Sequence, residues 1–244
     1  MSEVIKKNNA TEDAKPRVMR VVASSIFWPL AIFFVAQVVV AIALTPFIPA
    51  LSNSELEPSI LETFIYSATF ELLALTLVVL FLKWKKHNLK WLGLGKLKLE
   101  QLKPLLPAIG VYVVVTIGAF ILVSMLIPEV NLDQAQDVGF EEASSSLEII
   151  LAFVALVIVT PVTEEILMRG MMFRGLNRVM SFSWAAFLSA GIFALLHGQL
   201  NVGIDTFILG LVLAWLVNKT NSLWPAILLH MLKNMVAFSF LYLL

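Results

Sequence analysis

Two adjacent carboxylates and an arginine lie within a stretch, residues 160–170, that is otherwise hydrophobic. The three charged residues are Glu164, Glu165 and Arg169. A charged side chain at the centre of a membrane helix costs roughly 2.5–3.5 kcal/mol on insertion scales. Either the helix has already reached the aqueous edge of the membrane at this point, or these side chains face a wet cavity and perform chemistry there.

Helical geometry divides the two glutamates between different environments. Arg169 follows Glu165 by four residues, so the two share a helix face and can pair. Glu164 points about 100° away on the same helix and has no local cation. The spacing therefore predicts a structural role for Glu165 and a working role for Glu164. Pro161 lacks a backbone N–H and predicts a kink just before the glutamate pair.

Further polar residues occur at four-residue spacing in two later hydrophobic segments. Phe193 and His197 share one helix face, and His230 and Asn234 share another. Counting about 1.5 Å per residue from the nearest polar edge places His197 and Glu164 roughly 20 Å deep and His230 roughly 12 Å deep. A lone intramembrane histidine can instead serve as an interhelical hydrogen bond, worth about 0.6 kcal/mol. Because all these polar groups lie at compatible depths, we expect them to form one site.

The composition is that of an integral membrane protein. Of the 244 residues, 59% are hydrophobic and 14% are charged, whereas soluble domains are about 45–50% apolar and about 25% charged. The formal net charge is zero, which gives no indication of a nucleic-acid partner. The chain has no cysteine, which excludes disulfides, thiolate metal sites and a cysteine nucleophile.

The hydrophobic segments predict an all-α, polytopic transmembrane bundle of about seven spans. Basic residues concentrate in alternate loops, which predicts a cytoplasmic N-terminus. We expect three regions: a disordered cytoplasmic tail (1–20), an N-terminal region of about three spans (21–146) and a catalytic core of about four spans (147–244). The expected spans are 24–47, 60–82, 105–127, 147–168, 182–198, 203–217 and 223–244.

Two features outside these motifs allow alternative interpretations. The segment 90–102 mixes Trp, Leu and Lys, so it lies along the membrane interface or forms a plain basic loop. Glu71 and Lys233 lie at similar depth, so they can form an intramembrane ion pair. In the alternative, Lys233 contacts an anionic terminus of the substrate. We favoured the ion pair. Asp205 is assigned no role.

Three motifs, in order and on separate spans, carry a family resemblance. They are Glu164-Glu165-x3-Arg169-Gly170, Phe193-x3-His197 and His230-x3-Asn234. Together they resemble the CAAX protease and bacteriocin-processing family of intramembrane glutamic proteases, which is related to the prenyl-protein CAAX endopeptidases. The resemblance covers residues 147–238.

The resemblance implies a catalytic set and a supporting set. Glu164 would activate a water molecule that His197 holds or whose proton it shares, and His230 and Asn234 would donate to the developing oxyanion. Glu165 and Arg169 would position Glu164, with Phe193 also in support. No cofactor is expected. A zinc site formed by Glu164, His197 and His230 is the alternative, although the motif H-E-x-x-H is absent.

The predicted function is that of an intramembrane endopeptidase that hydrolyses a peptide bond with a glutamate-activated water. Its expected partners are the lipid bilayer and a membrane-associated peptide or protein substrate, which we expect to lack a prenyl group. We expect the protein in a prokaryotic plasma membrane, without a nucleic-acid partner. One alternative is a non-enzymatic bacteriocin-immunity or peptide-processing partner. Another is a proton-coupled transporter, which the lack of an inverted repeat disfavours.

Overall fold

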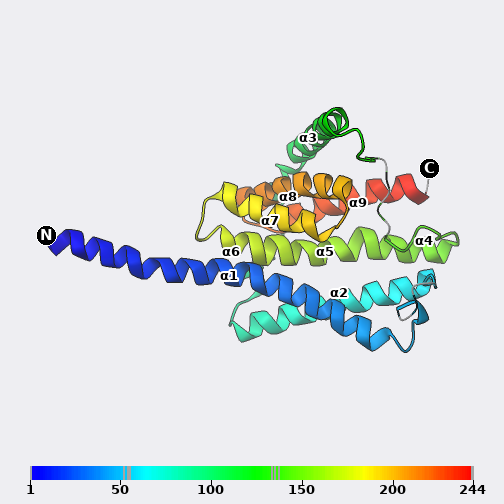
Figure 1. The fold of residues 1–244 in the computed structure, drawn as a ribbon, viewed down its shortest axis with the longest axis horizontal. Coiled ribbons are helices and arrows are strands. Elements are labelled where there is room, and N and C mark those ends of the chain that lie inside the picture. The colour runs from blue at the N-terminus through cyan, green and yellow to red at the C-terminus, as the bar shows by residue number, and fades with distance from the viewer. Residues whose placement is uncertain are drawn as a thin grey trace.

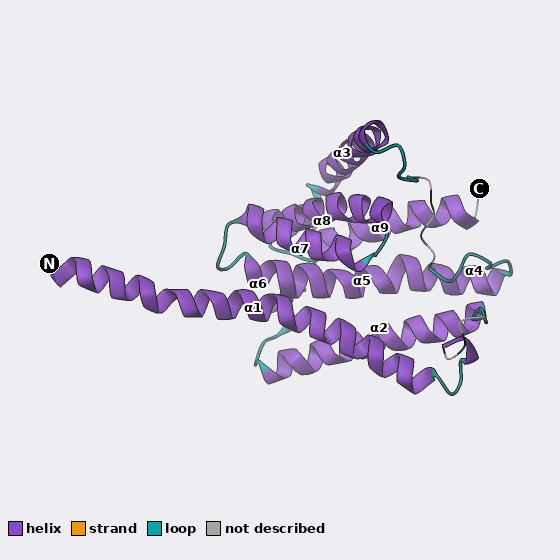
Figure 2. Cartoon of the chain, in the orientation of Figure 1, coloured by secondary structure: helices purple, strands orange, loops and turns teal. Residues whose placement is uncertain are grey.

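The computed structural model describes residues 2–51, 53, 56–132, 134, 136 and 138–242. Every regular element within these ranges is helical (Figure 2). Met1 of the expected tail and Leu243 and Leu244 of the expected last span lie outside the described residues. The main helices are α1 (Ser2–Leu44), α2 (Ile60–Trp84), α3 (Leu105–Leu126), α4 (Ser146–Phe153), α5 (Thr160–Glu165), α6 (Arg174–Leu176), α7 (Phe182–Leu196), α8 (Leu200–Thr220) and α9 (Trp224–Tyr242).

Seven apolar helical segments account for the seven expected spans. Among the described residues, six are long and apolar enough to cross a membrane, and the seventh, α7, is shorter. The prediction of an all-α, polytopic bundle is therefore confirmed, and the protein is an integral membrane protein.

Helix α1 extends beyond its expected span toward the N-terminus. We expected a disordered tail over residues 1–20, but the helix begins at Ser2. Its apolar, membrane-crossing part is Pro16–Leu44. Figure 1 shows the N-terminal end of α1 projecting past the other helices.

The segment that carries the glutamates is one continuous helical run, Ser146–Leu176. Two π-helical stretches, η4 (Val154–Val159) and η5 (Ile166–Phe173), flank the short α-helical segment α5. Such π turns are frequent at functional sites. Pro161 lies within α5, where we expected a kink, and the helical run continues through it.

This run forms the centre of the bundle (Figure 1). Helices α1 and α2 pack on one side of it, and α7, α8 and α9 pack on the other. Helix α3 packs mainly against α8. The glutamates of α5 therefore lie between the two halves of the bundle.

Two helices begin with reciprocal caps. Ser59 Oγ accepts from the backbone N–H of Glu62, whose carboxylate accepts from the N–H of Ser59, at the start of α2. Ser145 and Glu148 form the same arrangement at the start of α4. Each cap satisfies N–H groups that the first turn of a helix leaves without partners.

The basic segment 90–102 packs against the protein. It forms two short 3₁₀ helices, η2 (Leu89–Leu92) and η3 (Leu99–Leu102). Leu92 is buried, and the indole Nε1 of Trp224 donates to the carbonyl of Gly95 at 2.7 Å. These contacts dock the segment on the start of α9, so it is not a free basic loop; its position along the membrane interface stays a prediction.

Small residues bring α7 and α8 close together. A Cβ built on Gly210 of α8 would lie 2.8 Å from the Cβ of Ala190 on α7. Ala190 and Ala214 are both fully buried. Gly210 and Ala190 thus allow the close approach that small residues provide between membrane helices.

Candidate active site

The three motifs converge between α5, α7 and α9. Glu164 and Glu165 end α5, and Arg169 lies one turn later in η5. His197 immediately follows α7, and His230 lies in the first half of α9. The sequence-predicted glutamates and histidines thus come from three separate segments and meet inside the bundle.

Glu165 forms the ion pair that the helical spacing predicted. Its Oε1 lies 2.8 Å from Nη1 of Arg169, and both side chains are fully buried. The same oxygen lies 3.0 Å from Nδ1 of His230. One carboxylate therefore fixes a residue on its own helical run and another on α9.

The guanidinium of Arg169 is enclosed by its neighbours. It lies over the ring of Phe193, 4.3 Å from the ring centroid, in a cation–π contact. A Cβ on Gly210 would lie 2.9 Å from its Nη2, so the absence of a side chain at Gly210 provides the space. Among the described residues, Nε and Nη2 of Arg169 have no hydrogen-bond partner. Phe193 thus contacts the charged cluster directly.

Glu164 points away from this pair toward a small cavity. The cavity has a volume of about 130 Å³ and is lined by Glu164, His197, Phe193 and five other residues. The side chain of Glu164 keeps 24% of its surface exposed, whereas that of Glu165 keeps none. Glu165 is thus the buried carboxylate of the pair, and Glu164 is the accessible one.

The tautomer of His197 follows from its hydrogen bond. Nδ1 lies 2.8 Å from the carbonyl oxygen of Phe193. A carbonyl can only accept, so Nδ1 carries the proton. In the neutral ring Nε2 then keeps its lone pair, which can accept a hydrogen bond from a water molecule in the shared cavity.

His230 lies between the two glutamates. Its Nδ1 faces Glu165, and its Nε2 lies 3.6 Å from Oε2 of Glu164. That second separation allows electrostatic attraction but is too long for a hydrogen bond. Glu164 and His230 can share one proton. The cluster of Glu164, Glu165, Arg169 and His230 then has no net charge, whether that proton is on the carboxyl of Glu164 or on Nε2 of His230.

Asn234 lies one turn beyond His230, as expected, but its amide is directed elsewhere. Nδ2 donates to the carbonyl of Leu156, in the π-helical stretch η4, at 2.9 Å. Asn234 also lines a second cavity of about 430 Å³. The structure therefore brings together Glu164, His197 and His230 but does not direct the Asn234 amide toward them.

The predicted ion pair between Glu71 and Lys233 is wrong. Lys233 Nζ lies 3.1 Å from Oδ2 of Asp205, and the hydroxyl of Tyr112 donates to the same carboxylate. Glu71 is buried in α2, and its Oε2 has no partner among the described residues. Asp205 was assigned no role because its contact with Lys233 depends on the rotation of α8 and α9, which depth counting along single helices does not give.

The zinc alternative requires Glu164, His197 and His230 to direct their ligand atoms toward one point. In the part of the chain that the structure describes, no three His, Asp or Glu side chains are arranged to hold a metal ion. His230 has its Nδ1 on Glu165, and His197 has its Nδ1 on a backbone carbonyl, which leaves only their Nε2 atoms for a ligand. The choice between the two mechanisms is tested by chelation below.

Comparison with known proteins identifies the segment that carries the site. Residues 146–236 match the family model described as Type II CAAX prenyl endopeptidase Rce1-like. A protein of Bacillus subtilis (strain 168) named "Putative membrane peptidase YdiL" is 29% identical over 98 residues, which are 38% of this chain and 40% of that protein. The match thus spans less than half of this relative's length. No solved structure matches.

Proposed function

Because residues 146–236 belong to the CAAX protease and bacteriocin-processing family, we propose that the protein is an intramembrane endopeptidase that uses Glu164 to activate water. One observation carries the proposal. Glu164 and His197, from different helices, line the same cavity, and the hydrogen bond to Phe193 leaves Nε2 of His197 able to accept. A carboxylate and an imidazole facing a shared space suit general-base activation of a water molecule.

In the proposed reaction, a water molecule lies between Glu164 and His197. The Glu164 carboxylate takes one proton from it as the oxygen attacks the peptide carbonyl. The new C–O bond converts the carbonyl to an oxyanion, and collapse of this intermediate breaks the C–N bond. Glu164 then returns the proton to the leaving amine, so the carboxylate is regenerated.

His230 is the group best positioned to stabilise the oxyanion. Its ring is fixed through Nδ1 by Glu165, and its Nε2 faces Glu164. When protonated at Nε2, it can donate to negative charge that develops beside Glu164. Removing a donor of this kind typically lowers the rate by about 10²–10³.

The remaining motif residues have positioning roles in this proposal. Arg169 holds Glu165, and Glu165 in turn orients His230. Asn234 would fix α9 against the π-helical stretch through Leu156. We had expected Asn234 to contact the oxyanion directly, which would require its amide to leave this carbonyl.

The N-terminal region would shape the entrance to the site. Phe33 of α1 and Gln136 of the loop before α4 line the catalytic cavity, although both lie outside the segment that matches the family. We therefore propose that residues 21–146 select the substrate and residues 147–244 perform the chemistry. The substrate class that fits a site inside the bilayer is a membrane-associated peptide or protein.

The test compares cells that express the wild type, Glu164→Gln or Glu142→Gln. Glu142 is an exposed loop residue, so its variant controls for the loss of one carboxylate. New protein termini in the membrane proteome should appear with the wild type and Glu142→Gln and be absent with Glu164→Gln. A general base contributes about 10²–10⁴ in rate, so cleavage by Glu164→Gln should be undetectable.

Folding of Glu164→Gln is checked by its thermal unfolding after purification in detergent. Cleavage at the same sites by a folded Glu164→Gln would exclude Glu164 as the base. If wild type and Glu164→Gln both left every terminus unchanged, the non-enzymatic binding role would be favoured instead.

A further inference from the structure

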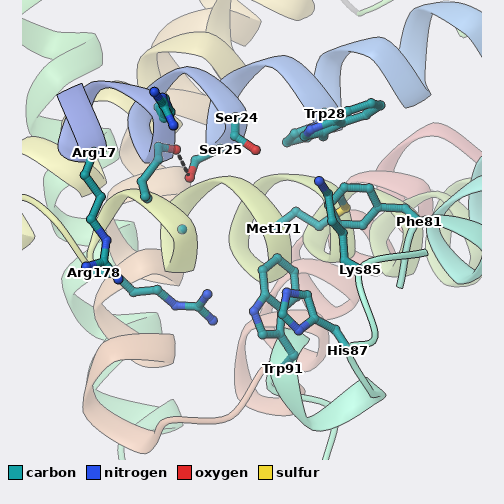
Figure 3. A pocket seen from close by; sticks show the side chains of 14 residues that line it. Arg17, Ser24, Ser25, Trp28, Phe81, Lys85, His87, Trp91, Met171 and Arg178 are labelled. Carbon is teal, nitrogen blue, oxygen red and sulfur yellow. Dashed lines mark hydrogen bonds between the residues drawn. The ribbon is translucent and has the colours of Figure 1, made fainter. Parts of the chain in front are cut away.

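A third cavity, separate from the catalytic cavity and from the one beside Asn234, lies at one end of the bundle and is lined by basic side chains. Its volume is about 350 Å³, and it lies between α1, the end of α2, the segment after it and the end of α6. Arg17, Arg20, Lys85 and Arg178 line it together with His87. Figure 3 shows Arg17 and Arg178 on one side of this basic cavity and Lys85 on the other.

The described residues around this cavity include no carboxylate to balance these charges. None of the described residues that line the basic cavity is acidic. Among the described residues, none of its three arginines or its lysine forms an ion pair. Four cations that converge on one space without a counter-ion repel one another, so an anion bound among them would relieve that repulsion.

Aromatic rings hold several of these basic groups in place. Arg178 lies over the ring of Trp91, 4.8 Å from its centroid. Lys85 lies 3.7 Å from the ring centroid of Trp84 and 5.8 Å from that of Trp28. His87 stacks on Trp91 at 4.6 Å with the rings 8° from parallel. Cation–π contacts orient a cation without neutralising it, so the charged groups are pre-positioned while their charge stays available.

The inner wall of the basic cavity is apolar. Phe81 and Met171 contribute to it, and Gly175 lies where α6 meets α1. A Cβ on Gly175 would lie 2.3 Å from Oγ of Ser25, so the two helices are in direct contact there. The cavity therefore offers cations to a charged group and an apolar wall to a chain attached to it.

Its position matches the level of lipid head groups. Arg17 and Arg20 lie at the start of the apolar part of α1, and Lys85 follows the last residue of α2. These ends are on the side that the loop charges predict to be cytoplasmic. Basic side chains and tryptophans at this depth are the groups that contact anionic head groups and the membrane interface.

We propose that the basic cavity binds the phosphate of an anionic phospholipid from the adjacent leaflet. The arginines and Lys85 would contact the phosphate oxygens. The lipid carbon atoms next to the phosphate group would lie along Phe81 and Met171. A free phosphate ion shares the anionic part of this chemistry but has no use for the apolar wall. The volume is within the range of small-molecule sites, roughly 300–1,000 Å³.

Binding there would join the N-terminal helices to the central helical run. Arg17 belongs to α1 and Lys85 directly follows α2, whereas Arg178 lies two residues after the helical run that carries Glu164. A phosphate that contacts both groups should stabilise the docking of α1 and α2 on that run. The unfolding temperature of the whole protein should therefore rise with the bound lipid.

The test uses the full chain, purified in detergent and freed of lipid. Phosphatidylglycerol is added to one sample, phosphatidylcholine to a second and inorganic phosphate to a third. Native mass spectrometry counts the lipid bound, and thermal unfolding gives the stabilisation. We expect one retained phosphatidylglycerol with a raised unfolding temperature, weaker retention of phosphatidylcholine, and no comparable shift with inorganic phosphate.

Matched variants locate the binding. Arg17→Gln with Arg178→Gln removes two cations from the cavity, and Lys96→Gln with Lys98→Gln removes two exposed lysines outside it. At about 1 kcal/mol per basic residue, the cavity pair should weaken binding by roughly 30-fold. The control pair should change it by a few-fold at most, because its lysines act only at long range.

A second cavity pair, Arg20→Gln with Lys85→Gln, covers the case in which the first does not fold. Unchanged phosphatidylglycerol binding by a folded cavity pair would overturn the proposal. Equal stabilisation by phosphatidylcholine would also overturn it, because the cavity would then not recognise the anionic charge. Equal stabilisation by inorganic phosphate would overturn it as well, because the cavity would then not recognise the lipid.

Discussion

Glu165 Oε1 accepts from Nδ1 of His230 at 3.0 Å, although the two residues are 65 positions apart in the chain. The same oxygen lies 2.8 Å from Arg169. Glu165 thus connects the ion pair of its own helix to the imidazole that faces Glu164. Its effect on activity should be transmitted through the orientation of His230.

The first prediction concerns Glu165→Gln, which keeps the side-chain shape and removes the charge. It leaves the buried Arg169 without its counter-ion, and breaking a buried pair in this way costs about 3–5 kcal/mol. We expect a large drop in unfolding temperature and a loss of cleavage. The exposed Glu142→Gln is the control, and a Glu165→Gln protein as stable as this control would contradict the pairing.

Glu165 contacts Arg169 on its own helical run and His230 on another helix, and the sequence could predict only the first of these two contacts. The pair of Glu165 and Arg169 follows from the four-residue spacing on one helix, which needs no knowledge of neighbouring helices. The contact with His230 depends on how α9 is rotated and how deep it lies, and one sequence does not contain that information. The recognised motifs named His230 as a site residue without naming its partner.

The same limit explains the error at Lys233. Depth counting placed Glu71 and Lys233 at comparable levels, but helical rotation and neighbourhood determine which acid is in reach. Lys233 contacts Asp205 of α8, and Glu71 faces the central helical run. Helix identity and approximate length were readable from hydrophobicity alone, which is why the spans were predicted well.

The second prediction concerns the pair of Lys233 and Asp205. Lys233→Met and Asp205→Asn should each destabilise the protein, and the double variant should cost less than the sum. Coupling between contacting residues is typically about 0.5–3 kcal/mol, which unfolding of the four proteins in a double-mutant cycle can resolve. Additive effects would show that the two side chains do not interact. Lys233→Met alone, assayed for KM, also tests whether Lys233 contacts a substrate terminus.

The third prediction concerns metal dependence. If Glu164 activates water directly, cleavage by the purified enzyme should be unchanged after treatment with 1,10-phenanthroline and dialysis. Loss of cleavage on chelation and its recovery with zinc would instead support a site of Glu164, His197 and His230.

The fourth prediction concerns Gly210, which lets α7 and α8 approach closely and makes room for Arg169. Gly210→Ala would place a methyl group 2.8 Å from the Cβ of Ala190 and 2.9 Å from Nη2 of Arg169. Overpacking of this kind costs about 1–3 kcal/mol, so we expect a lower unfolding temperature and reduced cleavage.

The matched control for Gly210 is Gly118→Ala in α3. A Cβ at Gly118 would have no atom within 4 Å. Alanine is favoured over glycine in a helix interior by roughly 0.5–1 kcal/mol, so this variant should be as stable as the wild type or slightly more stable. Equal effects of the two substitutions would show that helix propensity, and not packing, determines the result.

The last prediction concerns pH and rests on the proposed lipid site. Partial burial, together with the positive charges of Arg178 and Lys85, holds the pKa of His87 below its ordinary value. His87 is therefore neutral near neutral pH in the free protein. An anion bound beside it favours the imidazolium, so binding takes up a proton and the affinity should rise as pH falls.

The measurement compares phosphatidylglycerol binding at about pH 5.5 and about pH 8, on either side of the usual range for histidine. Histidine is the side chain whose ordinary pKa lies between about pH 5 and 8, and the described residues that line the cavity include no carboxylate. His87 is thus the group whose charge changes there. The wild type should bind more tightly at the lower pH, and His87→Gln should lose most of that difference. Persistence of the full pH dependence in His87→Gln would exclude His87 as its source.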